Sequence, residues 1–389
     1  MSPPAPGKAK LRLALIRQRY NPFGGAERFV ERALKALVDE GAEVTLITRS
    51  WQGAAQDGFL QKICNPKHSR LLGGRAARDR SFAASAQQAM AAGHYDITQA
   101  HERIPGCMIF RAGDGVHAAW LEHRARGKTA LTRIIDRCSP FHRFILKQEA
   151  AMLASPALKA VICNSHLVRE EMQRYYTVPE SKLVVIENGV DLDYFHPRLA
   201  DEWREKQRRS LGIDPLAPVF LFVGSGFERK GIAQLLPALA AMQPTNGHLV
   251  IVGQDRKLPT YQRQAEKLGL APRVHFVGPQ QDVRPYYGMA DAFVLPTRYD
   301  PMPNAALEAM ACGLPIITSL TCGMAARVSS GINGFVCDAL DIVQLTKHLD
   351  QLAAPGAAAA MRGAARDAVI DLDLESMASK LIGLYRSLL

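Results

Sequence analysis

Residues 298–318 read RYDPMPNAALEAMACGLPIIT, and they follow an apolar run at 292–295 that is typical of a buried strand. The prolines of Asp300-Pro-Met-Pro303 predict irregular backbone after that strand. Good helix formers follow from Asn304 onward, and a glycine and a proline further on predict that this helix ends before another strand begins. The segment therefore predicts a strand, a loop, a short helix and a second strand, which is the repeating pattern of an α/β sheet.

Two acids flank the start of this helix, Asp300 in the predicted loop and Glu308 in the helix itself. Ligands of open α/β sheets bind at the carboxyl ends of strands, and the amides that open a helix attract anions. Carboxylates accept hydrogen bonds from hydroxyl groups. A phosphate held between two polyols describes a nucleotide sugar, so we expect Asn304, Ala305 and Glu308 to bind substrate. Taken alone, Glu308 fits a surface acid on an ordinary helix equally well.

The amino-terminal part shows the same alternation, with a strand, a helix and a second strand predicted over residues 11–48. Gly24 and Gly25 lie in its first turn, without the Gly-x-Gly-x-x-Gly pattern of a dinucleotide site. The pair is either a plain tight turn or a place where backbone amides approach a phosphate or sugar. Asp114, between two glycines after a later strand, is likewise either a turn residue or a site carboxylate.

A second glycine loop, Gly224-Ser-Gly-Phe-Glu-Arg-Lys-Gly231, follows an apolar strand at 219–223. Gly224 and Ser225 leave the backbone open to a ligand, and the adjacent cations Arg229 and Lys230 suit a diphosphate. The spacing is not that of a Walker loop. Two series of strands and helices, each with a glycine turn after its first strand, predict two parallel-sheet domains.

The chain has 389 residues, 48% hydrophobic and 22% charged, which indicates a globular protein with room for two domains. Its seven cysteines are scattered without a Cys-x-x-Cys pair. We therefore expect neither a disulfide framework nor a zinc site, and a reducing cytoplasm fits best. The start of the chain has no apolar signal core, and no apolar run approaches roughly 20 residues. The net charge of +11 implies an anionic partner: nucleotide phosphates, nucleic acid or an anionic membrane surface.

Basic residues concentrate in residues 62–80, which we predict to be a loop, and in residues 120–150, which we predict to be helical. Apolar residues such as Leu131, Ile134 and Phe141 interleave with the cations of the second segment. They fit ordinary core packing, or a surface that rests on lipid. Each cation near an anionic leaflet contributes about 1 kcal/mol, so we expect reversible binding to such a membrane.

The motifs of the second half of the chain occur together in one enzyme family. The glycine loop at 224–231, Val-Gly-Gln-Asp255 and an acid ahead of Glu308-Ala-Met-Ala-Cys-Gly-Leu-Pro resemble family 4 of the retaining glycosyltransferases. Within that family the chain is similar to the bacterial lipopolysaccharide-core α-1,3-glucosyltransferases. The resemblance is strong over 219–337 and looser over 11–190.

The resemblance implies the α/β fold called GT-B, in which two Rossmann-like domains face each other across a cleft. The expected parts are a disordered tail at 1–10, an acceptor-binding domain at 11–197 and a nucleotide-sugar-binding domain at 198–370. A last helix at 371–389 is expected to return to the first domain, and the linker is expected near 195–200.

The resemblance also implies roles for single residues. Arg229 and Lys230 would hold the diphosphate and stabilise its charge as it leaves. Glu308 would bind the ribose hydroxyls, Asp300 would contact the donor sugar, and Asp114 would face the reacting centre. No metal or other cofactor is implied, and the nucleotide sugar, which we expect to carry UDP, is a co-substrate.

Two residues depart from the family pattern. Asp300 stands where the family usually has Glu and is one methylene shorter, which puts glucose as the donor sugar in doubt. Pro303 stands where a glycine amide is common, and it has no N–H to donate. Gly24 and Gly25 would lie across the cleft, near the donor phosphate and the acceptor.

These features predict a retaining, metal-independent hexosyltransferase that forms an α-glycoside on a lipopolysaccharide core or a similar lipid-linked envelope glycan. We expect it at the inner face of the cytoplasmic membrane, as a peripheral protein. A GT-B-type nucleotide-sugar epimerase is the alternative within the fold. A basic nucleic-acid-binding protein is a third reading, but the chain has no helix-turn-helix, zinc-finger or aromatic-basic motif, so we expect no nucleic-acid partner.

Overall fold

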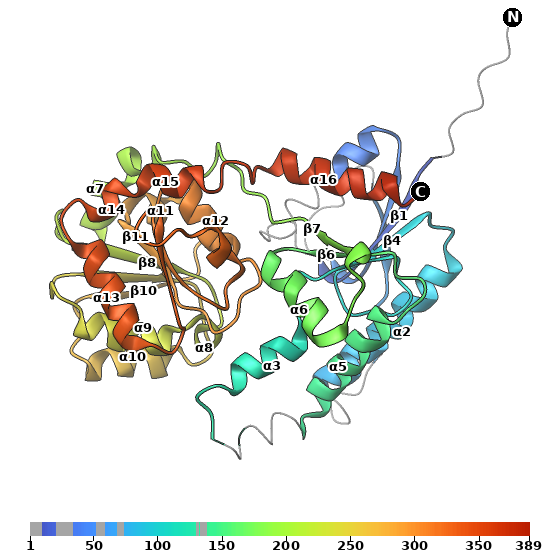
Figure 1. Cartoon of the computed structure of the whole chain (residues 1–389), viewed down its shortest axis with the longest axis horizontal. Coiled ribbons are helices and arrows are strands. Elements are labelled where there is room, and N and C mark those ends of the chain that lie inside the picture. The colour runs from blue at the N-terminus through green and yellow to red at the C-terminus, as the bar shows by residue number, and fades with distance from the viewer. Residues whose placement is uncertain (1–9, 21–33, 52–58, 68–73, 130–131, 133–137) are drawn as a thin grey trace, which may run out of the picture.

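Two α/β domains lie side by side in the protein and are joined by two passages of the chain (Figure 1). The structure, a computed structural model, describes residues 10–20, 34–51, 59–67, 74–129, 132 and 138–389. Each domain is built on one parallel sheet with helices on its faces. The predicted fold class, two Rossmann-like domains, is therefore confirmed. Nearly all of the tail predicted at 1–10 lies outside the described residues.

The N-terminal sheet has seven parallel strands in the order β3-β2-β1-β4-β5-β6-β7. They are β1 (Arg12–Tyr20), β2 (Glu43–Trp51), β3 (Phe59–Ile63), β4 (Ile97–Ala100), β5 (Ile109–Arg111), β6 (Ala160–Cys163) and β7 (Leu183–Val185). Buried residues of the interior strand β1 alternate between its faces, with Leu13 and Leu15 on one and Ala14 and Ile16 on the other. Both faces of this sheet are therefore covered, as is usual for parallel sheets.

Helices from distant parts of the chain cover these two faces. The face of Ala14 and Ile16 shares its core with α2 (Gly74–Ala92), α3 (His117–Ala125), α5 (Pro140–Leu153) and α6 (His166–Tyr176). The face of Leu13 and Leu15 packs against Leu381 and other residues of the last helix, α16 (Leu374–Ser387). Figure 1 shows α16 running from the C-terminal domain back to β1 and β4.

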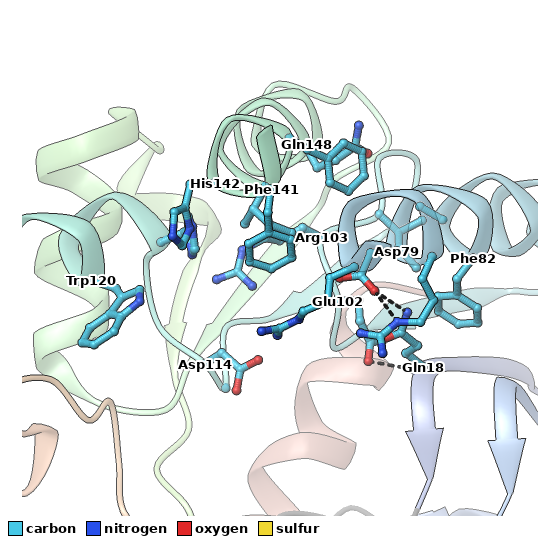
Figure 2. A pocket seen from close by; sticks show the side chains of 18 of the residues that line it. Gln18, Asp79, Phe82, Glu102, Arg103, Asp114, Trp120, Phe141, His142 and Gln148 are labelled. Carbon is cyan, nitrogen blue, oxygen red and sulfur yellow. Dashed lines mark hydrogen bonds and ion pairs between the residues drawn. The ribbon is translucent and has the colours of Figure 1, made fainter. Parts of the chain in front are cut away.

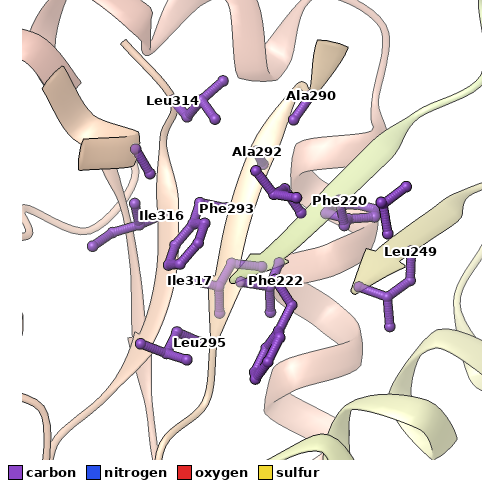
Figure 3. Close-up of a cluster of buried hydrophobic side chains, with 14 of the residues drawn as sticks. Phe220, Phe222, Leu249, Ala290, Ala292, Phe293, Leu295, Leu314, Ile316 and Ile317 are labelled. Atoms are coloured by element: carbon purple, nitrogen blue, oxygen red, sulfur yellow. The ribbon is translucent and has the colours of Figure 1, made fainter. Parts of the chain in front are cut away.

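The C-terminal sheet has six parallel strands in the order β10-β9-β8-β11-β12-β13. They are β8 (Val219–Val223), β9 (His248–Val252), β10 (Val274–Gly278), β11 (Ala292–Leu295), β12 (Ile316–Ser319) and β13 (Gly334–Cys337). Its helices are α7 (Leu199–Ser210), α8 (Phe227–Lys230), α9 (Ile232–Ala241), α10 (Leu258–Lys267), α11 (Arg284–Met289), α12 (Asn304–Ala311), α13 (Ile342–Ala353), α14 (Ala357–Ala360) and α15 (Arg362–Asp367). Phe220, Phe293 and Ile317 form the centre of its core (Figure 3).

The chain passes between the domains twice, and the two passages touch. Ile186 is buried in the N-terminal core and Val190 in the C-terminal core, so the first passage lies between them. Phe195, in the linker region predicted at 195–200, is already buried in the C-terminal core. The N-terminal domain therefore ends several residues before the predicted boundary at 197. The amide of Val190 donates a 2.8 Å hydrogen bond to the carbonyl of Leu372 in the second passage.

One of the two predictions for the basic segments is wrong. The segment 62–80, predicted to be a loop, contains the end of β3 and the beginning of α2. Apart from Phe82, the buried residues of α2 are alanines, so its apolar stripe is weak in the sequence. The segment 120–150, predicted to be helical, contains parts of the two helices α3 and α5. Helix α3 ends before Gly127, which has a φ of +71° that favours glycine.

Candidate functional site

The candidate site lies where the carboxyl ends of strands from both sheets meet. The residues around it follow β4, β5, β6 and β7 in one domain and β8 and β11 in the other, which is where open α/β sheets bind ligands. Between them is a cavity of about 440 Å³, the inter-domain cavity. It is lined by Arg17, His101, Glu102, Arg111, Gly113, Asp114, Asn164, Asn188, Val223, Gly224, Ser225, Arg229, Lys230, Asp300, Met302, Pro303, Asn304 and Ala305.

The inter-domain cavity brings together most of the residues that the sequence predicted for the site. These are Asp114, Gly224, Ser225, Arg229, Lys230, Asp300, Asn304 and Ala305. Glu308 is one turn further along α12 and does not line this cavity. Its Oε2 accepts a 2.8 Å hydrogen bond from the hydroxyl of the buried Tyr287. Gly24 and Gly25 lie outside the described residues.

Gly224 and Lys230 are packed against each other in the glycine loop. A Cβ on Gly224 would lie 2.7 Å from Cδ and Cε of Lys230 and 2.8 Å from its Nζ. The φ of Gly224 is +150°, a conformation that favours glycine. Helix α8 is only one turn long, and it leads the chain back so that the buried Lys230 lies over the loop. The glycine therefore leaves the space in which the ammonium group sits.

Asp255 supports this loop from the neighbouring strand. Its Oδ2 accepts a 2.7 Å hydrogen bond from the amide of Phe227, the first residue of α8. Gly253 lies so close that a Cβ there would be 2.1 Å from the carbonyl oxygen of Gly224. The sequence showed Val-Gly-Gln-Asp255 only as a family motif. The pairing of β8 with β9 explains it, because the loops that follow these two strands are neighbours.

Asp300 forms ion pairs with both cations of the glycine loop. Its Oδ2 lies 3.1 Å from Nη1 of Arg229 and 3.2 Å from Nζ of Lys230. Asp300 and Lys230 are buried, and Arg229 also donates a 2.9 Å hydrogen bond to the carbonyl of Tyr299. One carboxylate beside two cations leaves this group with a net positive charge. It is therefore suited to receive an anion.

A chain of hydrogen bonds joins the two domains across the cavity, and the sequence did not predict it. Nη2 of Arg111 donates to Oδ1 of Asn188 at 2.7 Å, and Nδ2 of Asn188 donates to Oδ1 of Asn304 at 2.7 Å. Burial lowers the pKa of Arg111 to about 9. The partners of Asn188 are 77 and 116 residues away in the chain, so no local pattern indicates these contacts.

Glu102 and His101 are two further cavity residues, and no motif in the sequence points to them. Oε1 of Glu102 accepts a 2.7 Å hydrogen bond from the amide of Gln18. Burial is the main reason that the pKa of Glu102 is raised to about 7; the Gln18 amide and Arg17 oppose the rise, and Asp114 adds to it. Burial and the charge of Arg17 hold the pKa of His101 well below its ordinary value. The N-terminal wall therefore carries a neutral histidine and a carboxyl that titrates near neutrality.

A second cavity of about 660 Å³, the helix-lined cavity, adjoins the first. It lies among α2, α3 and α5, with residues of the Asp300 loop at its edge. Figure 2 shows Trp120 and His142 at one side of it, Gln18 and Phe82 at the other, and Glu102 and Asp114 between them. Five residues line both cavities: Glu102, Gly113, Asp114, Arg229 and Asp300.

Tyr299, next to Asp300, belongs to the C-terminal domain but is buried in the N-terminal core. Its hydroxyl accepts a 2.9 Å hydrogen bond from the amide of Val116 and donates one of 2.5 Å to Glu171. A Cβ on Gly115 would lie 2.1 Å from this hydroxyl, so the turn after Asp114 is shaped around it. The domains are thus in contact directly beside the site.

Neither a membrane span nor a metal site is found in the part of the chain that the structure describes. In these residues, no helix has both the length and the apolar character needed to cross a membrane. Their His, Cys, Asp and Glu side chains form no group of three or more that could hold a metal ion.

Comparisons with known proteins fit this geometry. Residues 23–194 match the family model described as Glycosyltransferase Family 4, and residues 203–366 match the model described as Glycosyl transferases group 1. The chain belongs to the family 4 glycosyltransferases. The second match covers the glycine loop and the Asp300 loop of this family 4 glycosyltransferase, and the first covers most of the helix-lined cavity.

Relatives of this family 4 glycosyltransferase include proteins with named activities. It is 28% identical to the lipopolysaccharide glucosyltransferase WaaG of Escherichia coli (strain K12), over 83% of this chain and 84% of WaaG. It is 27% identical to D-inositol 3-phosphate glycosyltransferase 2 of Catenulispora acidiphila, over 83% of this chain and 82% of that protein. A crystal structure of WaaG, a glycosyltransferase involved in lipopolysaccharide biosynthesis, matches with a TM-score of 0.82 at 26% identity, covering 96% of this chain and 99% of that one. The predicted GT-B fold and the resemblance to this group are confirmed.

Proposed function

We propose that this family 4 glycosyltransferase is a retaining hexosyltransferase that uses a UDP-sugar and forms an α-glycosidic bond on a lipopolysaccharide core or a related envelope glycan. The observation that carries the proposal is the meeting of the two cavities at Asp114, Arg229 and Asp300. A transferase needs one space for the donor, a second for the acceptor and a common centre. The similarity to WaaG, which acts in lipopolysaccharide biosynthesis, supports the choice of acceptor.

The leaving group determines the chemistry of the inter-domain cavity. Breaking the bond between the anomeric carbon and the diphosphate oxygen leaves additional negative charge on the diphosphate. Arg229 and Lys230 stabilise that charge, which is usually the largest contribution to such catalysis. These side-chain cations supply the charge that a metal ion supplies in other transferases, so the proposed reaction is metal-independent. Gly224 and Ser225 allow the phosphates to approach the backbone.

Donor recognition is assigned to the Asp300 loop and α12. Asp300 contacts hydroxyls of the donor sugar, Asn304 and Ala305 contact the donor at the start of α12, and Glu308 binds the ribose. The short side chain of Asp300 leaves room for a sugar with a substituent pattern different from that of glucose. Because Pro303 has no N–H to donate, the side-chain amide of Asn304 donates a hydrogen bond to the donor substrate at this end of the helix instead.

The configuration at the anomeric carbon is retained if the acceptor approaches on the side of the leaving group. The acceptor hydroxyl oxygen bonds to the anomeric carbon while the bond to the diphosphate breaks, and the hydroxyl proton passes to a diphosphate oxygen. This route needs no carboxylate nucleophile and therefore no pair of carboxylates as in a glycosidase. Asp114, at the junction of the two cavities, faces the reacting centre.

The lipid-linked acceptor places the enzyme at the inner face of the cytoplasmic membrane, as a peripheral protein. Arg143 and Lys147 are exposed one turn apart on α5, next to the helix-lined cavity, and supply the basic contact. Arg126 instead pairs with Asp338 of the other domain at 2.5 Å. Phe141 is half-buried with the Arg75 guanidinium 4.8 Å from its ring, so it does not serve as a lipid anchor. Leu131 and Ile134 lie outside the described residues.

One assay tests the proposal. The protein is incubated with UDP-glucose, and with GDP- and ADP-sugars for comparison, with and without lipopolysaccharide truncated at its inner-core heptose. We expect UDP release that depends on the acceptor, and an α-anomeric signal in the product by NMR. Nucleotide release or sugar conversion without an acceptor indicates an epimerase. In the same panel, a donor at 100 times its Kd stabilises the fold by about 2.7 kcal/mol and raises the melting temperature.

A further inference from the structure

The side chains of Arg124, His142 and His117 form a hydrogen-bonded row on the wall of the helix-lined cavity. The mechanism above uses none of them. Nη1 of Arg124 lies 3.1 Å from Nε2 of His142, and Nδ1 of His142 lies 3.1 Å from Nε2 of His117. All three line the cavity, and His117 is buried. Figure 2 shows His142 beside Phe141 on the α5 side of this cavity.

The direction of these hydrogen bonds follows from chemistry. Arginine can only donate, so Nε2 of His142 accepts and carries no proton. A neutral His142 then holds its proton on Nδ1 and donates it to Nε2 of His117. His117 in turn holds its own proton on Nδ1. That atom forms no hydrogen bond with any residue that the structure describes, so it is an N–H donor without a described partner on a residue that lines the cavity.

The charges that act on the His117 ring are positive. Burial, together with smaller effects of Arg103, His142 and Arg124, lowers the pKa of His117 to about 3. The ring is therefore neutral at physiological pH. The same positive field favours an anion in contact with it.

Two groups that contact His117, Phe141 and Glu149, do not cancel this environment. Phe141 meets His117 edge-on, with the ring centroids 6.4 Å apart, and the Arg75 guanidinium lies over the same Phe141 ring. Glu149, the carboxylate that accepts from the His117 amide, is already bound by Nε of Arg103 at 2.7 Å and by the hydroxyl of Tyr176 at 2.7 Å. Its charge is thus compensated within the wall.

We propose that His117 donates a hydrogen bond to an anionic substituent of the acceptor, a phosphate or a carboxylate, in the helix-lined cavity. His142 and Arg124 behind it keep His117 a donor, and Arg75, which lines the same cavity, supplies positive charge. This inference rests on the proposed function, because it places the acceptor in this cavity. The anion site itself can be tested without sugar transfer.

The test uses protein labelled with ¹⁵N in its histidine rings and follows the His117 nitrogens by NMR. Inorganic phosphate and acetate are added separately, in the presence of excess UDP, which occupies Arg229 and Lys230. We expect one of the anions to shift the His117 Nδ1 signal and to bind at least about tenfold more weakly to His117→Ala. His117→Gln retains an N–H donor and should recover part of the affinity. His94→Ala, which removes an exposed histidine, is the matched control.

The outcomes separate the two sources of the anion. A response to phosphate alone indicates a phosphorylated acceptor, and a response to acetate alone indicates an acidic sugar. His142→Phe keeps an aromatic ring but removes the hydrogen bond to His117. The proton of His117 should then move toward Nε2, and the anion should bind more weakly. If neither anion perturbs His117, or if His117→Ala binds them as wild type does, the inference is overturned.

The transfer assay distinguishes this failure from failure of the proposed function. Wild-type protein that transfers sugar but binds no anion at His117 leaves the transferase standing and removes the inference. Protein that binds the anion at His117 but transfers no sugar leaves the anion site and removes the proposed function. Thermal melting of each variant shows whether its fold is retained.

Discussion

The hydroxyl of Tyr299 donates a 2.5 Å hydrogen bond to Oε2 of Glu171, and this contact holds the C-terminal domain to the N-terminal domain directly beside Asp300. Both residues are buried. Asp300, the partner of Arg229 and Lys230, is therefore the next residue after one that is anchored in the opposite domain. The position of the site carboxylate depends on how the domains meet.

Tyr299→Phe should lower the free energy of unfolding by about 2 kcal/mol, because a buried hydrogen bond to a charged group contributes roughly 1.5–3 kcal/mol. Glu171, only 6% exposed, loses its donor in this variant. Tyr95→Phe is the control, since the Tyr95 hydroxyl makes no hydrogen bond with the described residues. Chemical denaturation measures both, and equal stability of Tyr299→Phe and wild type would contradict the role of the contact.

Lys230→Ala should lower kcat by about 10²–10³, the scale for losing one group that stabilises charge in the transition state. Glu308→Ala should instead raise the KM for the donor more than it lowers kcat, because ribose hydroxyls do not change charge during the reaction. Steady-state kinetics of both variants decide this. Kinetics of Lys230→Ala close to those of wild type would refute its assignment.

Asp300→Asn should separate binding from turnover. The change removes the carboxylate that balances Arg229 and Lys230, so the loop becomes more positive and UDP should bind at least as tightly as to wild type. Turnover should fall, because the contact with the donor sugar is altered. Calorimetry with UDP and kinetics with the UDP-sugar test the two parts, and full activity would reduce Asp300 to a loop acid.

Glu102→Gln should change the dependence of stability on pH. The pKa of Glu102 in the folded protein, about 7, lies above the ordinary value of 4.5. Its contribution to stability is therefore full below about pH 4.5 and is lost as the pH rises through about 7. The side chain at position 102 of the variant cannot ionise. Between pH 5 and pH 8, the free energy of unfolding of the variant should therefore rise by roughly 1–3 kcal/mol relative to that of wild type, since one pKa unit corresponds to about 1.36 kcal/mol.

Urea denaturation at several pH values measures this difference. Glu170→Gln, on the exposed side of α6, removes the same charge from the same domain and should show no such gain. If the free energies of unfolding of Glu102→Gln and wild type differed by the same amount at every pH from about 5 to 8, Glu102 would be ionised over that whole range.

Replacing both Arg143 and Lys147 by Gln should weaken binding to anionic vesicles. Both are exposed on α5, and each cation near an anionic leaflet contributes about 1 kcal/mol. Arg263 and Lys267, exposed at the same spacing on α10 of the other domain, provide the matched double variant, which should bind as wild type does. Co-sedimentation at rising salt measures this, because screening shortens the Debye length from about 10 Å at 0.1 M to 3 Å at 1 M. Equal recovery with neutral and anionic vesicles would remove the membrane contact.

How far the sequence reveals this molecule depends on whether a feature is local. The apolar strands at 219–223 and 292–295 and the glycine loop between Gly224 and Gly231 carry strong local signals, and they led to Arg229, Lys230 and Asp300. Helix α2 was missed because it buries mainly alanines. The bridge through Asn188 was missed because its partners lie on a strand and on a helix of different domains, and only the packing of the domains brings them together.

Helix α16 follows the whole C-terminal domain in the chain, yet Leu381 and Tyr385 complete the core beneath Leu13 and Leu15. The hydroxyl of Tyr385 also reaches Gln99 of β4 at 2.8 Å. During synthesis, the N-terminal domain therefore emerges from the ribosome with an apolar face uncovered, and it keeps that face until the second domain has been made. The nascent chain offers chaperones a binding surface for this interval, and the domain that is translated first is the last to be finished.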